Sequence, residues 1–125
     1  MIFTQILIGT VIIVLTIILQ ALFVSTASSN LTQRGLWLSK PPFKTAGATV
    51  AVVLWLLAGI SISIWIWSSI FMLLDVFDSL EAALYFSLVT FTTLGYGDIT
   101  VNENWRILAS FAAVNGVIIF GLNTA

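Results

Sequence analysis

The stretch Ile2–Val24, IFTQILIGTVIIVLTIILQALFV, holds 23 residues, none of them charged and most of them apolar. A helix needs ~20 apolar residues to cross the ~30 Å of hydrocarbon in a bilayer. The rest of the chain has the same character, since 60% of its 125 residues are apolar and 7% are charged. A soluble globular domain carries roughly 25% charged residues. The sequence therefore predicts a single membrane domain.

Two further stretches, residues 45–74 and 107–125, also lack charged residues. The last one reaches spanning length when Trp105 and Arg106 are added at the membrane interface. We predict three transmembrane helices, over residues 2–25, 46–74 and 104–125. A signal peptide is the alternative for the first helix, because the small residues at 25–28 resemble a cleavage region. Two features argue against a signal peptide. The N-terminus has no cations, and the apolar run is longer than the ~7–15 residues of a signal-peptide hydrophobic region.

The charged residues predict an orientation in the membrane. Three of the four cations (Arg34, Lys40 and Lys44) lie in the loop over residues 26–45, and all five acids lie between residues 75 and 103. The positive-inside rule then places the 26–45 loop in the cytoplasm and the N-terminus outside. An aromatic belt at the outer interface is expected from Trp65, Trp67 and Trp105.

A shorter apolar segment lies between the second and third predicted spans. Asp78-Ser79-Leu80-Glu81 predicts a helix start, with Asp78 as the N-cap and Glu81 three residues later. The predicted helix, residues 79–92, is ~21 Å long at 1.5 Å per residue and too short to span. Glycine-rich backbone follows it, and such backbone is tolerated inside a membrane only when buried in protein or lining a water-filled cavity. We therefore predict a re-entrant element.

The segment after this short helix is Thr92-Thr93-Leu94-Gly95-Tyr96-Gly97-Asp98. A dehydrated monovalent cation needs a cage of oxygens, and backbone carbonyls provide one without full charge. Successive carbonyls face one axis when the backbone alternates between right- and left-handed regions, which Gly95 and Gly97 permit at low cost. One chain supplies one strip of carbonyls. A closed cage thus requires several copies, most simply a cyclic tetramer.

These seven residues resemble the potassium-channel signature sequence. The resemblance extends to residues 83–89, which are similar to the family's pore helix, and to residues 114–125, which are similar to the inner helix of simple bacterial channels. It covers about residues 46–125 and leaves the first helix outside. It implies an all-α membrane protein in which three transmembrane helices, a re-entrant pore helix and a filter over residues 93–98 assemble as a homotetramer.

The resemblance also implies roles for individual residues. The K⁺ ions would bind to filter oxygens of Thr93, Leu94, Gly95, Tyr96 and Gly97. Asp98 would hydrogen-bond to the pore helix behind the outer mouth. Further support of the filter would come from Tyr85, Phe86, Val89 and Thr92. The inner cavity would be lined by Val117, Phe120 and Thr124. Two positions depart from the family pattern: Leu94 replaces the commoner Val, and Val89 stands where some bacterial members carry a Glu.

Several positions have two interpretations. Gly116 either is the hinge of a gating bend or forms a small-residue helix contact together with Ala112. For Asn115 we favour an interhelical hydrogen bond over a functional role. Gln5 and Gln20 are interface residues or helix contacts. The acids outside the signature either concentrate cations at the outer mouth or form a solvated face; they are Asp75, Asp78, Glu81 and Glu103.

The function that these features predict is passive K⁺ conduction across the cell membrane, with no chemical step and no organic cofactor. The absence of His and Cys removes the commonest general base and any thiolate metal site. A net charge of −1 with four cations excludes a nucleic-acid partner. The alternatives are a weakly selective cation channel and a non-conducting membrane interaction module. We expect the first helix to be peripheral and a longer C-terminal region to follow residue 125.

Overall fold

The computed structural model describes residues 2–34 and 42–124 of the chain. The described elements are all helical: α1 (Ile2–Arg34), α2 (Pro42–Leu73), α3 (Leu80–Phe91), the 3-10 turn η1 (Glu103–Trp105) and α4 (Arg106–Thr124). Three stretches, residues 2–30, 44–73 and 103–124, are long and apolar enough to cross a membrane. The predicted fold class, with three helices of spanning length and one short helix, is confirmed for the single chain.

Helix α1 continues to Arg34, well past the end that we predicted near residue 25. The end of the apolar run marks the expected limit of the hydrocarbon, but no Pro or Gly follows before Gly35 to stop the helix. The Thr26 hydroxyl donates to the Leu22 carbonyl at 2.8 Å, so this polar side chain finds a hydrogen-bond partner inside the helix. Lys40 and the centre of the predicted 26–45 loop lie outside the described residues.

Helix α2 has a distinct signal at each end. It begins at Pro42, whose missing N–H costs nothing in the first helical position. After Leu73 the chain forms a Schellman motif, in which the Val76 N–H donates to the Phe71 carbonyl at 2.9 Å. Asp75 adopts the positive φ of 53° that this motif requires. The motif turns the chain sharply toward α3.

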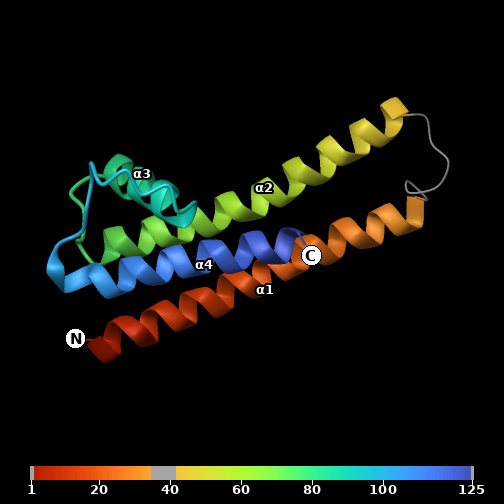
Figure 1. The fold of residues 1–125 in the computed structure, drawn as a ribbon. Helices are drawn as coiled ribbons and strands as arrows, with labels where there is room; N and C mark the ends of the chain where they lie inside the picture. The colour runs from red at the N-terminus through yellow and green to blue at the C-terminus, as the bar shows by residue number, and fades with distance from the viewer. Residues whose placement is uncertain (1, 35–41, 125) are drawn as a thin grey trace.

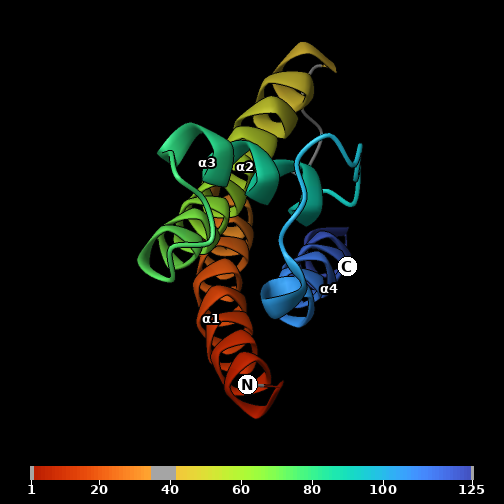
Figure 2. The same cartoon turned by 90° about the vertical axis from the view of Figure 1, so that its left-hand side faces the viewer.

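The helices form a layered bundle (Figures 1 and 2). Helices α1 and α3 lie on opposite sides of α2 and α4, and the N-terminus lies at the end of the bundle that carries α3. Helix α1 runs in the same direction as α4 and opposite to α2. Contact between α1 and α2 includes the Phe23 and Trp55 rings, which stack with centroids 4.6 Å apart. The short helix is thus held at one end of a three-helix frame.

The hydrophobic core lies between α2, α3 and α4, and Ile12 of α1 also belongs to it. Trp67 and Phe71 of α2 are fully buried there. The prediction that Trp67 belongs to an outer aromatic belt is therefore wrong, because this face of α2 is covered by protein. Trp65 is 48% exposed, since two residues along a helix correspond to a turn of about 200°.

Candidate functional site

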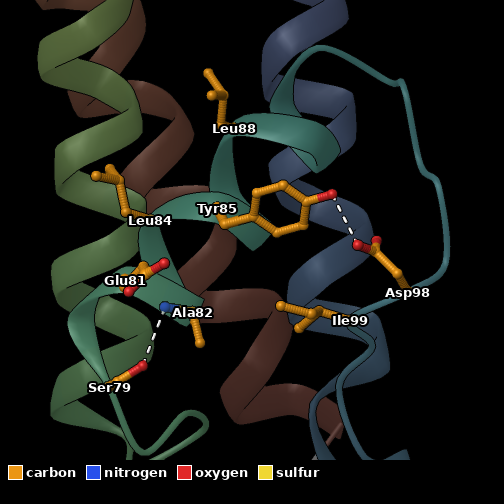
Figure 3. Close-up of a pocket in the computed structure, with 8 residues that line it drawn as sticks. All are labelled: Ser79, Glu81, Ala82, Leu84, Tyr85, Leu88, Asp98 and Ile99. Atoms are coloured by element: carbon orange, nitrogen blue, oxygen red, sulfur yellow. Dashed lines mark hydrogen bonds between the residues drawn. The ribbon is translucent and has the colours of Figure 1, made fainter.

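The short helix α3 begins one residue later than the sequence predicts. Ser79, not Asp78, is the N-cap: its backbone is extended and its Oγ accepts the Ala82 N–H at 3.2 Å (Figure 3). A cap hydroxyl reaches the third helical amide from the residue directly before the helix. Asp78 lies one position too early and is exposed. The helix consists of 12 residues, Leu80–Phe91, in place of the predicted 79–92.

Aromatic rings seat α3 on α2. Phe86 lies in the core with its ring centroid 5.6 Å from that of Phe71 and 5.1 Å from that of Phe77. Val89 is also buried, at 6% exposure. Both were predicted to support the loop after α3, and both lie on the face of α3 that faces the core. Burial of these apolar side chains fixes the position of the short helix.

The C-terminal end of α3 rests directly on α4. A methyl group placed on Gly116 would overlap the Phe91 carbonyl oxygen, and its carbon would lie 2.7 Å from the Phe91 carbonyl carbon. Gly116 and Ala112 are both buried. Of the two interpretations of Gly116, the packing contact is therefore present, although its partner is the short helix. Helix α4 runs without interruption through Gly116, so the hinge stays a prediction.

Along the backbone after α3, residues with a positive φ alternate with residues that lack one. Thr93, Gly95 and Gly97 have positive φ values of 63°, 56° and 79°, while Leu94 and Tyr96 between them do not. We expected positive φ at the two glycines only. A positive φ at Thr93 was not expected, because a β-branched side chain is rarely found in the left-handed region. A strained residue in such a place points to function.

Hydrogen bonds attach this loop to the short helix. The Gly95 N–H donates to the Val89 carbonyl at 3.1 Å. The Thr92 hydroxyl donates to the Leu88 carbonyl at 2.8 Å, and the Thr93 hydroxyl donates to the Thr92 carbonyl at 2.6 Å. The beginning of the loop is therefore fixed by the last turn of α3.

A side-chain bond attaches the other end of the loop. The Tyr85 phenol donates to Asp98 Oδ2 at 2.8 Å (Figure 3). This bond raises the pKa of Tyr85 above its ordinary value of 10.0, with smaller contributions from desolvation and from the Asp98 charge. The phenol therefore stays protonated and remains a donor at neutral pH. Tyr85 and Asp98 thus stand in the relationship that the resemblance implied, with Asp98 bonded to the short helix.

The loop is exposed in the single chain. Leu94 is 55% exposed and Tyr96 is 70% exposed, although both are large and apolar or aromatic. Beside the loop lies an open pocket of about 660 Å³. Figure 3 shows it between the first turns of α3 and the Asp98–Ile99 segment; it is lined by Ser79, Glu81, Ala82, Leu84, Tyr85, Leu88, Asp98 and Ile99.

The predicted cavity residues of α4 do not all behave alike. Val117 is 58% exposed and Thr124 is exposed, and both belong to a face of α4 that the chain leaves uncovered. Phe120 is half-buried, because its ring packs against that of Phe91 with centroids 6.0 Å apart. Two of the three residues therefore face outward, and the third braces the end of α3.

Asn115 forms the interhelical hydrogen bond that we favoured. Its Nδ2 donates to Thr16 Oγ1 of α1 at 2.7 Å, and both side chains are fully buried. Gln5 and Gln20 are helix contacts as well, each bonded to α4. Thr16 was missed, because a lone threonine in an apolar helix usually satisfies itself on its own backbone.

A family model described as an ion channel matches residues 50–125. The chain belongs to this ion channel family. Searches of curated proteins and of solved structures returned no match. Membership supports ion conduction in general and agrees with a membrane protein whose helices are of spanning length.

The ion channel match includes α2 from Val50, α3, the loop and all of α4. The short helix, the alternating backbone and the uncovered face of α4 therefore all belong to the channel pore domain. Helix α1 lies outside the match, yet its polar side chains bond to α4 within the same bundle.

Proposed function

We propose that this ion channel is a potassium-selective pore that conducts K⁺ passively through a filter of backbone carbonyls. The observation that carries the proposal is the positive φ at Thr93, Gly95 and Gly97, which alternates with the residues between them. This segment directly follows a short helix that packs against α4. Alternating hand turns successive carbonyls toward one side of the strip. K⁺ would bind to oxygens of Thr93, Leu94, Gly95, Tyr96 and Gly97, exchanging its hydration shell for them.

The assembly that we propose is a homotetramer. A single strip of carbonyls leaves an ion open to water on most sides, so several strips must close around one axis. Leu94, Tyr96 and one face of α4 are exposed in the single chain, and an open pocket lies beside Tyr85. Further copies would cover these surfaces. In a closed cyclic assembly every chain has the same neighbours, so the same surfaces are covered on every chain.

Other parts of the chain support cation conduction. The C-terminal end of α3 carries the partial negative charge of a helix dipole, and the filter loop begins there. Val117 and Thr124 would line the cavity below the filter, with Phe120 at a level between them. Supporting residues, namely Tyr85, Phe86, Val89, Thr92 and Asp98, hold the loop from behind.

The proposed orientation places the filter loop and the N-terminus outside the cell membrane. Both lie at the same end of the bundle (Figure 1). Arg34 and Lys44 lie at the opposite ends of α1 and α2, which agrees with a cytoplasmic loop under the positive-inside rule.

The test is a reversal potential measured on purified protein in planar lipid bilayers with opposing K⁺ and Na⁺ gradients. A reversal near the K⁺ equilibrium potential, with block by Ba²⁺, supports the proposal. A reversal near zero with robust current would instead establish a weakly selective cation channel. Protein that inserts and assembles but passes no current under any gradient would point to a non-conducting interaction module.

A further inference from the structure

Helix α1 brings an unusual set of polar side chains into the bundle. Gln5, Thr16 and Gln20 are 3%, 0% and 0% exposed, and they lie within the mostly apolar run of residues 2–24. Burying polar groups in an apolar surrounding is costly unless they are bonded. Each of these three residues forms a hydrogen bond to α4.

These bonds occur at three levels of α4. Gln5 Oε1 accepts the Leu108 N–H at 3.0 Å, which satisfies a free amide in the first turn of α4. Asn115 Nδ2 donates to Thr16 Oγ1 at 2.7 Å, and the Thr16 hydroxyl lies 2.9 Å from Asn115 Oδ1 and 3.0 Å from the Ile13 carbonyl. Asn123 Oδ1 accepts Gln20 Nε2 at 2.8 Å. The three positions on α4 are about two helical turns apart and so lie on one face.

Gly116 divides these contacts into two groups. Near Gly116, α4 is held from two sides, by Thr16 through Asn115 and by the Phe91 backbone against Gly116. In the last turn of α4 the described hydrogen bonds from outside the helix reduce to the one from Gln20 to Asn123. Movement of the end of α4 relative to α1 must therefore break or strain that bond.

The position of Gln20 is fixed by α2 as well. Gly59 of α2 leaves just enough room for the Gln20 amide, because a methyl group on Gly59 would overlap Gln20 Oε1. Gln20 Nε2 also lies 3.5 Å from the Leu56 carbonyl. Gln20 therefore sits where α1, α2 and α4 meet.

We propose that Gln20 is a positioning residue of the pore: through Asn123 it ties the end of the inner helix α4 to α1. The helix outside the matched channel segment then sets the ratio of open to closed pores. This inference rests on the proposed function, since it assigns α4 the role of a pore-lining helix. It assigns no part of ion selectivity to α1.

The first experiment compares single-channel records of Gln20→Leu, Asn123→Leu and the double variant with wild type. Each single change should alter the open-to-closed ratio in the same direction by about threefold per subunit, the size expected of one interhelical hydrogen bond in a membrane. The double variant should match the single ones, because they remove one bond. Unit conductance and reversal potential should stay at the wild-type values.

The matched control is Thr16→Val, which removes a bond between the same helices near Gly116, where Phe91 still holds α4. It should lower thermal stability and leave the open-to-closed ratio unchanged. Gly59→Ala provides a second variant, since it displaces the Gln20 amide without altering its chemistry and should shift gating as Gln20→Leu does. Additive effects of Gln20→Leu and Asn123→Leu, or equal gating shifts from Thr16→Val, would overturn the proposal.

A cross-linking experiment tests the packing without requiring conduction. The chain contains no Cys, so Thr16→Cys with Asn115→Cys introduces the sole thiol pair. Oxidation in lipid should link the two residues within one chain, whereas Thr16→Cys with Val117→Cys should not form that link. Absence of the first link in folded protein, or links only between chains, would refute the α1 contact. A link formed in this variant, together with wild-type protein that assembles but passes no current, would instead refute the proposed function.

Discussion

The Cα atom of Gly116 lies against the backbone carbonyl of Phe91, so that the inner helix and the end of the short helix touch through main-chain atoms. The loop over residues 92–98 follows directly after Phe91. A close backbone contact transmits displacement more directly than a contact between flexible side chains. The position of α4 is therefore coupled to the start of the loop through this backbone contact, beside the contact between the Phe91 and Phe120 rings.

Substitution Gly116→Ala should disrupt this contact. The added methyl group has no room unless α3 moves, and overpacking of this kind costs about 1–3 kcal/mol. The matched control is Gly121→Ala on the same helix, where a methyl group would meet nothing within 4 Å. We expect a lower melting temperature for Gly116→Ala and an equal or higher one for Gly121→Ala. Equal melting temperatures for the two variants would contradict the contact.

Alanine at Gly95 or Gly97 should abolish or severely reduce ion flux. The reason is conformational, since a methyl group at Gly97 meets no atom within 4 Å while φ is +79°. Holding a non-glycine residue in the left-handed region costs roughly 1–2 kcal/mol, which favours a flipped peptide and breaks the carbonyl strip. Flux from K⁺-loaded liposomes measures the effect. Wild-type flux in Gly97→Ala would show that the alternation is not needed.

Removal of the Tyr85 hydroxyl should destabilise the loop in a pH-dependent manner. The folded pKa of Tyr85 lies above 10.0, so the bond to Asp98 contributes fully below pH ~10 and is lost as the pH rises through the folded pKa. The difference in melting temperature between wild type and Tyr85→Phe should therefore stay constant near neutral pH and shrink only in strong alkali. A difference that vanishes at neutral pH would exclude this bond as its source.

The identity of the α3 cap can be tested with two neighbouring alanine substitutions. Ser79→Ala should cost about 1 kcal/mol, the usual loss for a helix N-cap. Asp78→Ala should have little effect on stability, because the Asp78 side chain is exposed. Thermal melting of the two variants in one detergent provides the comparison. The reverse order of stability would restore Asp78 as the cap.

The general architecture could be predicted from the sequence because it depends on the positions of long stretches without charged residues. Uncharged stretches of spanning length define the long helices, and the interval between them leaves room for one short helix. Helix ends were predicted less well: α1 runs on to Arg34, since the limit of an apolar run says nothing about where a helix stops. The cap at Ser79 differs from the prediction by one residue for a similar reason, because two adjacent polar residues both suit an N-cap.

Contacts that depend on helix rotation could not be predicted. Trp65 and Trp67 have the same composition signal, yet only Trp67 is buried, because α3 and α4 cover one face of α2. Thr16 and Asn115 are 99 residues apart in sequence, and nothing local to either residue specifies the other. The positive φ of Thr93 likewise arises from the loop as a whole, whereas glycine signals the same geometry on its own.

The bonds between α1 and α4 have a consequence for biosynthesis. Helix α1 is translated first, and its partners Leu108, Asn115 and Asn123 are translated about a hundred residues later. Because synthesis proceeds from the N-terminus, Gln5, Thr16 and Gln20 lack their hydrogen-bond partners on α4 until that helix has been inserted. A chain interrupted before α4 would therefore lack the Leu108 N–H that Gln5 accepts and would leave Gln20 with the Leu56 carbonyl of α2 as its partner.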